Sequence, residues 1–406
     1  MSDPAARCAG VGMGGCLADH GLTPRGYKMP ASLRPLPSLK ILPAFSSSGN
    51  ILLVSVFASF IIKRMDEASE HLKKAVLWEP SDDGVHCFLC NWNCHIADGK
   101  KGRCFVRKNI GGTLYSLNYD KLCAANPDPI EKKPLFHFQP GSKSFSIATP
   151  GCNFRCVFCQ NWQISQVDTE NILEGSLYSP EQIVQAALDT ECQSVAYTYT
   201  EPTIFFELAE ETAKLAKSKG LANVFVSNGY MSKQAIDAAK GWLDGVNIDL
   251  KAFTEDFYKD LCKAHIQPVK DNIEYIAKHT DIWMELTTLL IPGKNDSEDE
   301  LKSLAEFIAS VSVDIPWHVS RFYPQYKMTD VRPTDGAVLE RAYDIGKEAG
   351  LRYIYIGNLP GVRAESTYCY SCGAMLIERV GYQVLNNVID DYRCPQCNAE
   401  IAGFGL

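Results

Sequence analysis

The sequence of 406 residues has no excess of positive charge, no long apolar run and no apolar run near its first residue. Its 40 Lys and Arg residues stand against 48 Asp and Glu residues, which gives a formal net charge of −8. A negative net charge argues against a nucleic-acid partner, and the sequence also lacks a basic patch interleaved with aromatic residues. The sequence therefore gives no clear indication of a nucleic-acid partner, and RNA as a substrate has no positive support.

The most apolar stretch, Ile51–Ile62, is shorter than the roughly 20 residues that a transmembrane helix needs. A signal peptide would place such a run much nearer the start of the chain. The surrounding residues 1–64 are rich in Gly, Pro, Ser and Ala. We interpret residues 1–64 as a disordered or non-native extension, with Met65 as the natural start. A membrane anchor is the alternative, but we expect no membrane association.

Cysteine, in contrast, is abundant: the chain has 16, mostly grouped at metal-ligand spacings rather than scattered like disulfide partners. Thiolate ligands need a reducing compartment, so we expect a cytoplasmic protein. Cys123, Cys192 and Cys262 stand alone, and we interpret them as structural. The cysteines that remain after residue 64 form three sets.

The central set is Cys152-x3-Cys156-x2-Cys159, on a loop that follows a predicted strand. Three thiolates on one loop can hold three irons of a [4Fe–4S] cluster and leave the fourth iron open to an outside ligand. A zinc loop or three unrelated core cysteines are the alternatives. The close spacing of the three residues makes core cysteines a poor explanation.

The first set precedes it, as Cys87-x2-Cys90-x3-Cys94-x9-Cys104. Four thiols in so short a stretch predict one metal site, which holds either zinc or an auxiliary iron–sulfur cluster. Spacing alone does not separate these two possibilities.

The last set consists of Cys369-x2-Cys372 and Cys394-x2-Cys397, separated by 21 residues. This pattern resembles a zinc ribbon, in which the metal supplies much of the folding free energy. A tetrahedral set of four sulfurs accepts zinc or iron.

From about residue 144, predicted strands alternate with predicted helices, which is typical of a parallel sheet with crossover helices. About seven such units in some 215 residues approach the length of a (β/α) barrel, and a doubly wound open sheet is the alternative. The predicted strands are Ser144–Ala148, Ser194–Thr200, Asn223–Ser227, Gly245–Leu250, Trp283–Leu290, His318–Phe322 and Arg352–Ile356. The predicted helices include one that opens at Ser179, Thr203–Lys219, Ser232–Trp242, Glu255–Cys262, Val269–His279, Ser297–Val311 and Gly336–Ala349.

In a parallel barrel the active site forms at the carboxyl ends of the strands. Polar residues follow several of the predicted strands, and they are candidate ligands of a bound cofactor: Glu201, Ser227, Asn228, Asp249 and Lys251. Each also has a structural explanation. Glu201 suits the start of a helix, Asn228 suits a turn, and Lys251 and Asp249 could pair with each other.

The cysteine triad and its flanks resemble the radical S-adenosylmethionine (SAM) superfamily. The segments 128–138 and 159–166 resemble the radical SAM enzyme of the AmmeMemoRadiSam system, which is related to the activating enzymes of glycyl-radical enzymes such as pyruvate formate-lyase. The resemblance covers residues 70–406. It implies an incomplete parallel (β/α)6-type barrel at 141–364, after a Cys-rich module at 65–140 and before a zinc-ribbon-like module at 365–406.

The resemblance also implies the chemistry: a [4Fe–4S] cluster on the triad, reductive cleavage of SAM to a 5′-deoxyadenosyl radical, and hydrogen abstraction from a substrate. An electron donor such as flavodoxin or ferredoxin is implied with it. Glu201 would receive the SAM amino group, Lys251 its carboxylate, and Ser227, Asn228 or Asp249 its ribose. The family's two glycines before the Glu are replaced by Tyr199 and Thr200.

Three hypotheses about function follow from this. The first is modification of a small molecule, peptide or RNA alongside Memo-like and AMMECR-like partner proteins. The second is a glycyl-radical enzyme activase. The third, from another class, is a metal-stabilised binding or scaffold protein with a degenerate pocket.

Overall fold

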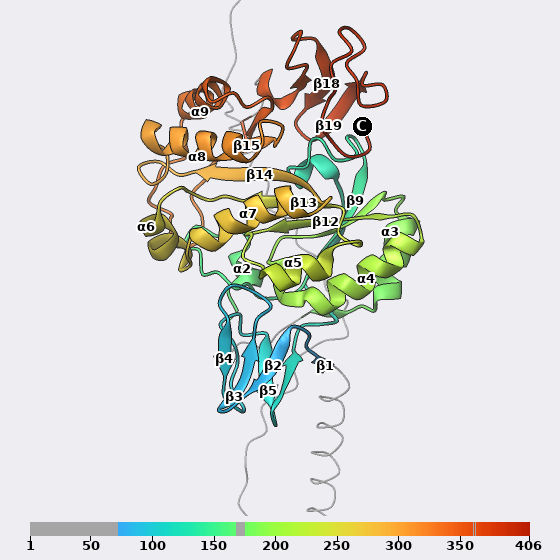
Figure 1. The fold of residues 1–406 in the computed structure, drawn as a ribbon, viewed down its shortest axis with the longest axis vertical. Helices are drawn as coiled ribbons and strands as arrows, with labels where there is room; N and C mark the ends of the chain where they lie inside the picture. The colour runs from blue at the N-terminus through green and yellow to red at the C-terminus, as the bar shows by residue number, and fades with distance from the viewer. Residues whose placement is uncertain (1–71, 168–174, 360, 362) are drawn as a thin grey trace, which may run out of the picture. The chain divides into compact units, whose positions relative to one another are not determined.

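One large sheet organises the chain, with its strands in the order β16-β15-β14-β13-β12-β11-β9-β8 (Figure 1). The computed structural model describes residues 72–167, 175–359, 361 and 363–406, so the predictions for residues 1–64 lie outside it. The parallel strands are β9 (Lys143–Ala148), β11 (Ser194–Tyr197), β12 (Ala222–Ser227), β13 (Gly245–Asp249), β14 (Trp283–Leu290), β15 (Trp317–Arg321) and β16 (Ile354–Gly357). An antiparallel strand, β8 (Ala124–Pro129), covers the edge of β9.

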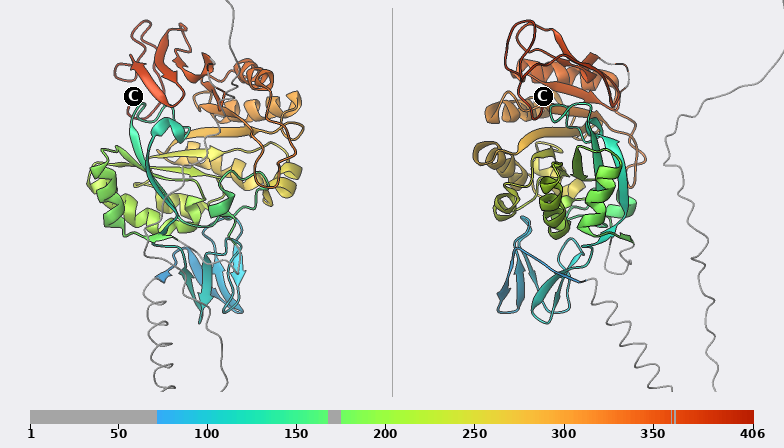
Figure 2. Two further views of the ribbon diagram at one scale, coloured as in Figure 1. Left: turned by 180° about the vertical axis from the view of Figure 1, so that it is seen from behind. Right: turned by 90° about the vertical axis from the view of Figure 1, so that its right-hand side faces the viewer.

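The parallel strands follow chain order without a reversal, which decides between the two predicted architectures. Right-handed crossovers between successive neighbours place their helices on the same face of the sheet. A doubly wound sheet would instead reverse its strand order at a switch point. The sheet ends at β8 and β16 rather than closing on itself, so the predicted incomplete parallel barrel is confirmed (Figure 2).

The crossover helices begin where their caps predict. Ser179 caps α3 by accepting from Gln182 N, and Ser232 and Ser297 cap α5 and α8 through Ala235 N and Glu300 N. The helices are α3 (Pro180–Asp189), α4 (Phe206–Ser218), α5 (Lys233–Ala239), α7 (Gln267–His279), α8 (Glu298–Val311) and α9 (Gly336–Glu348). No helix among the described residues is both long and apolar enough to cross a membrane.

Two predicted helices are not α-helical throughout. The helix predicted from Thr203 starts with a 3-10 turn, η2 (Pro202–Phe205), because the Glu201 carboxylate caps the Thr203 amide. The helix predicted at Glu255–Cys262 is α6 (Glu255–Phe257) continued by a π-helical turn, η3 (Tyr258–Cys262). That turn presents two carbonyl groups to the cysteine loop.

The residues before the large sheet form two small antiparallel sheets, in the orders β1-β6-β5 and β2-β3-β4. Their strands are β1 (Lys73–Lys74), β2 (Trp78–Ser81), β3 (Gly84–Cys87), β4 (Cys94–Ile96), β5 (Arg107–Ile110) and β6 (Thr113–Ser116). A short ribbon pairs β7 (Lys121–Leu122) with β10 (Ser176–Leu177). Although β8 lies in the range assigned to the N-terminal module, it belongs to the large sheet.

The final residues form a three-stranded antiparallel sheet of β17 (Thr367–Tyr368), β18 (Met375–Val380) and β19 (Gln383–Asn387). It packs on Phe136, Tyr353 and Tyr355, around the fully buried Ile377. The buried Arg379 of β18 donates to the Phe136 carbonyl at 2.7 Å. This contact ties the module to the segment that precedes β9.

Candidate metal and cofactor site

A pocket of about 300 Å³ lies at the carboxyl ends of the parallel strands. A cavity of this size falls in the range of small-molecule sites. All eight residues predicted for the triad and its cofactor line it: Cys152, Cys156, Cys159, Glu201, Ser227, Asn228, Asp249 and Lys251. The structure thus brings together residues from a sequence span of about 100 positions, as their places after the predicted strands indicated.

The cysteine loop is held in place by the π-helical turn η3. Arg155 N donates to the Cys262 carbonyl at 3.0 Å, and Val157 N donates to the Leu261 carbonyl at 2.9 Å. The helix α2 (Trp162–Ser165) follows the loop and places the Ser165 hydroxyl 3.1 Å from the Cys159 sulfur. The loop geometry is therefore set by backbone contacts and does not require the thiols to bond one another.

The environment of the three thiols fits a thiolate-ligated metal group. Burial raises the pKa of Cys152 and of Cys159, and a hydrogen bond with the Cys262 thiol together with burial raises the pKa of Cys156. Buried thiols of this kind become thiolates when a metal supplies the compensating charge. Phe154 N donates to the Cys152 sulfur at 3.3 Å, which is a contact that favours thiolate.

Cys262 lies behind Cys156 rather than in the pocket. It is fully buried and is not among the residues that line the cavity. The triad therefore faces the cavity with three thiols, as expected for a cluster with one open iron.

Glu201 is the most constrained acidic group of the pocket, with a side chain that is 1% exposed. Its Oε1 accepts from Thr203 N at 3.1 Å, Thr203 Oγ1 at 2.5 Å and Ser227 Oγ at 2.8 Å. Its Oε2 accepts from Asn228 N at 2.8 Å. Burial raises the pKa of Glu201, whereas these hydrogen bonds oppose the rise. Oε2 retains capacity for a further donor, because a carboxylate oxygen accepts more than one hydrogen bond.

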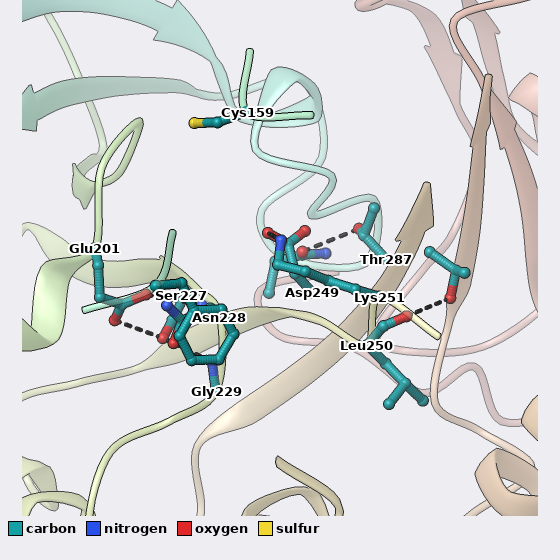
Figure 3. A network of polar contacts seen from close by, with 12 residues as sticks. Cys159, Glu201, Ser227, Asn228, Gly229, Asp249, Leu250, Lys251 and Thr287 are labelled. Atoms are coloured by element: carbon teal, nitrogen blue, oxygen red, sulfur yellow. Dashed lines mark hydrogen bonds and ion pairs between the residues drawn. The ribbon is translucent and has the colours of Figure 1, made fainter. Parts of the chain in front are cut away.

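Asn228 joins the strand ends to the cysteine loop. Its Nδ2 donates to Asn153 Oδ1 at 2.7 Å, and its Oδ1 accepts from Tyr230 N at 3.1 Å. Figure 3 shows Glu201, Ser227 and Asn228 gathered on one side of the site, with Cys159 on another wall. The turn predicted for Asn228-Gly229 is present, and Gly229 has a φ of 72°.

Asp249 and Lys251 form the second polar group of the pocket (Figure 3). Lys251 Nζ lies 2.8 Å from Asp249 Oδ2. The two residues therefore pair with each other, as the structural explanation of their positions predicted. Burial opposes the charged form of Lys251, but the Asp249 carboxylate and the neighbouring thiols raise its pKa above the usual value. The pair still lines the pocket and presents a cation there.

Several pocket residues were missed by the sequence reasoning. Lys132, Lys133 and Tyr199 form one wall, whereas Thr287 lies within β14, Ser320 near the end of β15 and Asn358 just after β16. Ser320 and Asn358 could have been found from the ends of the predicted strands, but Thr287 could not. The two lysines stand in the segment 128–138, which carried the resemblance without an assigned role.

The lysine wall is an ordered network around Asp128. Lys133 is 1% exposed and lies 2.7 Å from Asp128 Oδ2, while Lys132 lies 2.7 Å from Asp128 Oδ1. The Tyr199 hydroxyl also donates to Asp128, and Tyr199 has a φ of 62° in place of the family's glycine. Burial lowers the pKa of Lys133 to about 8, although Asp128 opposes the change.

His318, on the strand β15, belongs to the core and does not line the pocket. Its Nε2 lies 2.7 Å from Glu285 Oε2, and both side chains are buried. Arg321 donates to the Thr334 carbonyl at 2.7 Å.

The C-terminal cysteines form a compact group in which all four sulfurs lie within 4.8 Å of one another. The distance between sulfurs is 3.6 Å for Cys369 and Cys397 and 3.7 Å for Cys372 and Cys394. A tetrahedral ion with Zn–S bonds of about 2.3 Å separates its ligands by a similar distance. The predicted zinc-ribbon-like group is therefore formed and suits a single metal ion.

Comparison with known proteins agrees with this geometry. The profile of the radical SAM superfamily matches residues 146–308. The chain is 42% identical over 334 residues to an uncharacterized protein of Methanocaldococcus jannaschii, covering 81% of this chain and 99% of the relative. It is 25% identical to a GTP 3′,8-cyclase of Limosilactobacillus fermentum, covering 58% of this chain and 75% of the relative.

A pyruvate formate-lyase-activating enzyme of Listeria monocytogenes is 26% identical, with 60% of this chain and 92% of the relative covered. The superfamily match spans the strands from β9 to β14 and the helix α8, and so includes the cysteine triad and the polar residues around it. The chain belongs to the radical SAM superfamily and is an enzyme of that superfamily.

Proposed function

We propose that the protein holds a [4Fe–4S] cluster on Cys152, Cys156 and Cys159 and binds SAM in the adjoining pocket, to generate a 5′-deoxyadenosyl radical that takes hydrogen from a substrate. The observation that carries this proposal is the convergence of the eight predicted ligands on one pocket. When bound, the cluster supplies one electron for cleavage of the SAM sulfonium, and that chemistry belongs to the cofactor.

The chain's own residues bind and orient SAM in this proposal. Glu201 Oε2 has capacity to accept from the SAM ammonium group, and Lys251 offers a cation to its carboxylate. Ser227, Asn228 and Asp249 are the candidates for the ribose hydroxyls. The structural pairing of Lys251 with Asp249 supports this assignment, since it holds the cation at the pocket wall before SAM arrives.

The substrate would occupy the part of the pocket lined by Lys132, Lys133 and Tyr199. The two lysines share one carboxylate, Asp128, and thus leave one net positive charge on this wall. None of these three residues is a proposed cofactor ligand. Pocket residues that do not bind the cofactor are the ones expected to differ between enzymes with different substrates.

For the substrate, modification of a small molecule or peptide alongside Memo-like and AMMECR-like partners is supported by the segments 128–138 and 159–166. Activation of a glycyl-radical enzyme is the second candidate, and the similarity to a pyruvate formate-lyase-activating enzyme favours it. A flavodoxin or ferredoxin is proposed as the electron donor in both cases. An EPR search for a glycyl radical, after incubation with a candidate glycyl-radical enzyme, distinguishes them.

For the C-terminal group we propose structural zinc, because its sulfur distances of 3.6 and 3.7 Å suit one tetrahedral ion.

The experiment that tests the central proposal is anaerobic reconstitution followed by EPR of the reduced protein with and without SAM. The wild type should show a cluster signal that changes when SAM is added. Cys156→Ala should lose that signal, whereas Cys262→Ala, the matched control behind it, should keep the signal and its response to SAM. A full SAM-responsive signal in Cys156→Ala would contradict the proposal.

A further inference from the structure

A second group of thiols lies outside the pocket, in the N-terminal module. Its members line one small cavity of about 20 Å³: Cys87, Cys90, Cys94 and Cys104. Cys87 and Cys94 are direct partners across the β3–β4 hairpin, and Cys90 lies in its turn. Cys104 reaches the cavity from the segment between β4 and β5. The hairpin fold therefore places all four cysteines on the wall of one cavity.

The rest of the cavity wall is apolar apart from two arginines, Arg103 and Arg107. Leu89, Ile96 and Ile204 are among the apolar residues that line it. Arg107 is 1% exposed, and charged side chains this deeply buried normally have a specific partner. Its Nη2 forms an ion pair with the buried Glu207 of α4. Arg107 is thus a buried cation beside a cavity that is lined mainly by thiols and hydrocarbon.

One hydrogen-bond donor of the buried Arg107 guanidinium is unmatched within the described part of the chain. Its Nη1 donates to the Val76 carbonyl at 2.8 Å and lies 3.6 Å from the Cys87 sulfur. Its Nε is buried and has no hydrogen-bond partner among the described residues. An unmatched buried donor costs free energy, and a neutral thiol is only a weak acceptor. A thiolate or a cluster sulfide beside Arg107 would be a strong acceptor.

We propose that Cys87, Cys90, Cys94 and Cys104 hold a second metal centre, ligated by thiolates, with Arg107 as the hydrogen-bond donor to its sulfur atoms. The ligand is a thiophilic metal, either one zinc ion or an iron–sulfur cluster, since both take four thiolates. A cationic donor beside thiolate ligands is the arrangement expected around a buried, negatively charged metal site.

The proposed centre also braces the radical SAM site. The hairpin turn carries Trp92, whose Nε1 donates to the Asn153 carbonyl of the cysteine loop at 2.9 Å. Asn91 N donates at 3.0 Å to the carbonyl of Tyr230, two residues after the pocket residue Asn228. Metal at the base of this turn would fix both contacts. The centre is thus a positioning element for the cysteine loop and lies outside the catalytic pocket.

The test is a metal count on the full chain after anaerobic reconstitution with iron, sulfide and zinc. Compared with the wild type, the Cys90→Ala/Cys104→Ala variant should lose about one zinc or about four irons per chain. Which metal is lost identifies the centre, and either loss supports the proposal. The matched control is Cys123→Ala, a lone half-buried cysteine, which should retain the full metal content. Equal zinc and iron in the double variant and the wild type would overturn the proposal.

A second variant of the chain provides the test if the double variant does not fold. Replacing Cys156, Cys159, Cys372 and Cys397 with Ser leaves the N-terminal set as the only complete one. This chain should still bind about one zinc or about four irons. A metal-free but folded chain, as judged by circular dichroism, would overturn the proposal. The count is independent of SAM cleavage, so failure of the proposed function would not be confused with failure of this inference.

Discussion

Replacing Glu201 with Gln is the most informative single change at the SAM site. The Glu201 carboxylate accepts four hydrogen bonds, from Thr203 N, Thr203 Oγ1, Ser227 Oγ and Asn228 N. Glutamine keeps the shape but replaces one acceptor oxygen with an amide NH2. Whichever way the amide turns, one donor of the strand end faces another donor, and the negative charge next to the SAM ammonium is lost.

The size of the effect follows from these contacts. A hydrogen bond to a charged group contributes about 1.5–3 kcal/mol. Losing one such bond to the SAM ammonium should weaken SAM binding roughly 10- to 150-fold, since each 1.4 kcal/mol is tenfold in Kd. The lost acceptor inside the protein should lower the free energy of unfolding by a similar amount, about 1–3 kcal/mol.

The assay is SAM binding by isothermal titration to the reconstituted, anaerobic protein, alongside urea unfolding. Glu285→Gln is the matched control, because Glu285 is also fully buried and accepts from Phe136 N, His137 N, Trp283 Nε1 and His318 Nε2. Both variants should lose stability, but only Glu201→Gln should lose SAM affinity. Equal SAM affinity in the Glu201→Gln variant and the wild type would refute the assignment of Glu201 to the ammonium group.

Three further predictions concern other parts of the chain. Lys251→Met should weaken SAM binding by about one to two orders of magnitude through loss of a charge-assisted contact, as measured by the same titration, and unchanged affinity would remove Lys251 from the carboxylate site. Burial lowers the pKa of His137 to about 4, so the unfolded chain binds more protons than the folded one between about pH 6.5 and 4. Stability should therefore fall as the pH is lowered through that window, with less of a fall in His137→Gln, and identical urea-unfolding profiles against pH would contradict this. Cys372→Ser/Cys397→Ser should release about one metal ion per chain while the iron of the triad is retained, and a metal count that does not change would exclude the C-terminal site.

The sequence was sufficient for the framework of the fold, because that framework depends on local signals. Apolar strands of β-branched residues alternate with capped amphipathic helices, and Ser179, Ser232 and Ser297 each begin a helix as their side chains predict. Strand β14 has the predicted bounds, Trp283–Leu290. The resemblance then selected the incomplete barrel over the doubly wound sheet, and the strand order confirmed it.

Site residues were predictable where a residue with recognisable chemistry follows a strand. They were missed where tertiary contacts bring a residue to the pocket. Cys152 and Glu201 follow strands and carry recognisable chemistry, so the sequence indicated both. Lys133 reaches the pocket only because β8 adds to the edge of β9, and no local pattern predicts that antiparallel pairing. The same holds for Arg107, whose burial beside the thiols depends on Glu207, 100 residues further along the chain.

The measurement that tests the central claim most directly is the yield of 5′-deoxyadenosine. The reconstituted protein, with about four irons on its triad, would be incubated anaerobically with SAM and dithionite, and the product would be quantified by mass spectrometry. The account predicts 5′-deoxyadenosine and methionine from the wild type and from Cys262→Ala, and none above background from Cys156→Ala. The central claim would be contradicted if a wild-type protein with a full cluster gave no 5′-deoxyadenosine, or if Cys156→Ala formed it at the wild-type rate.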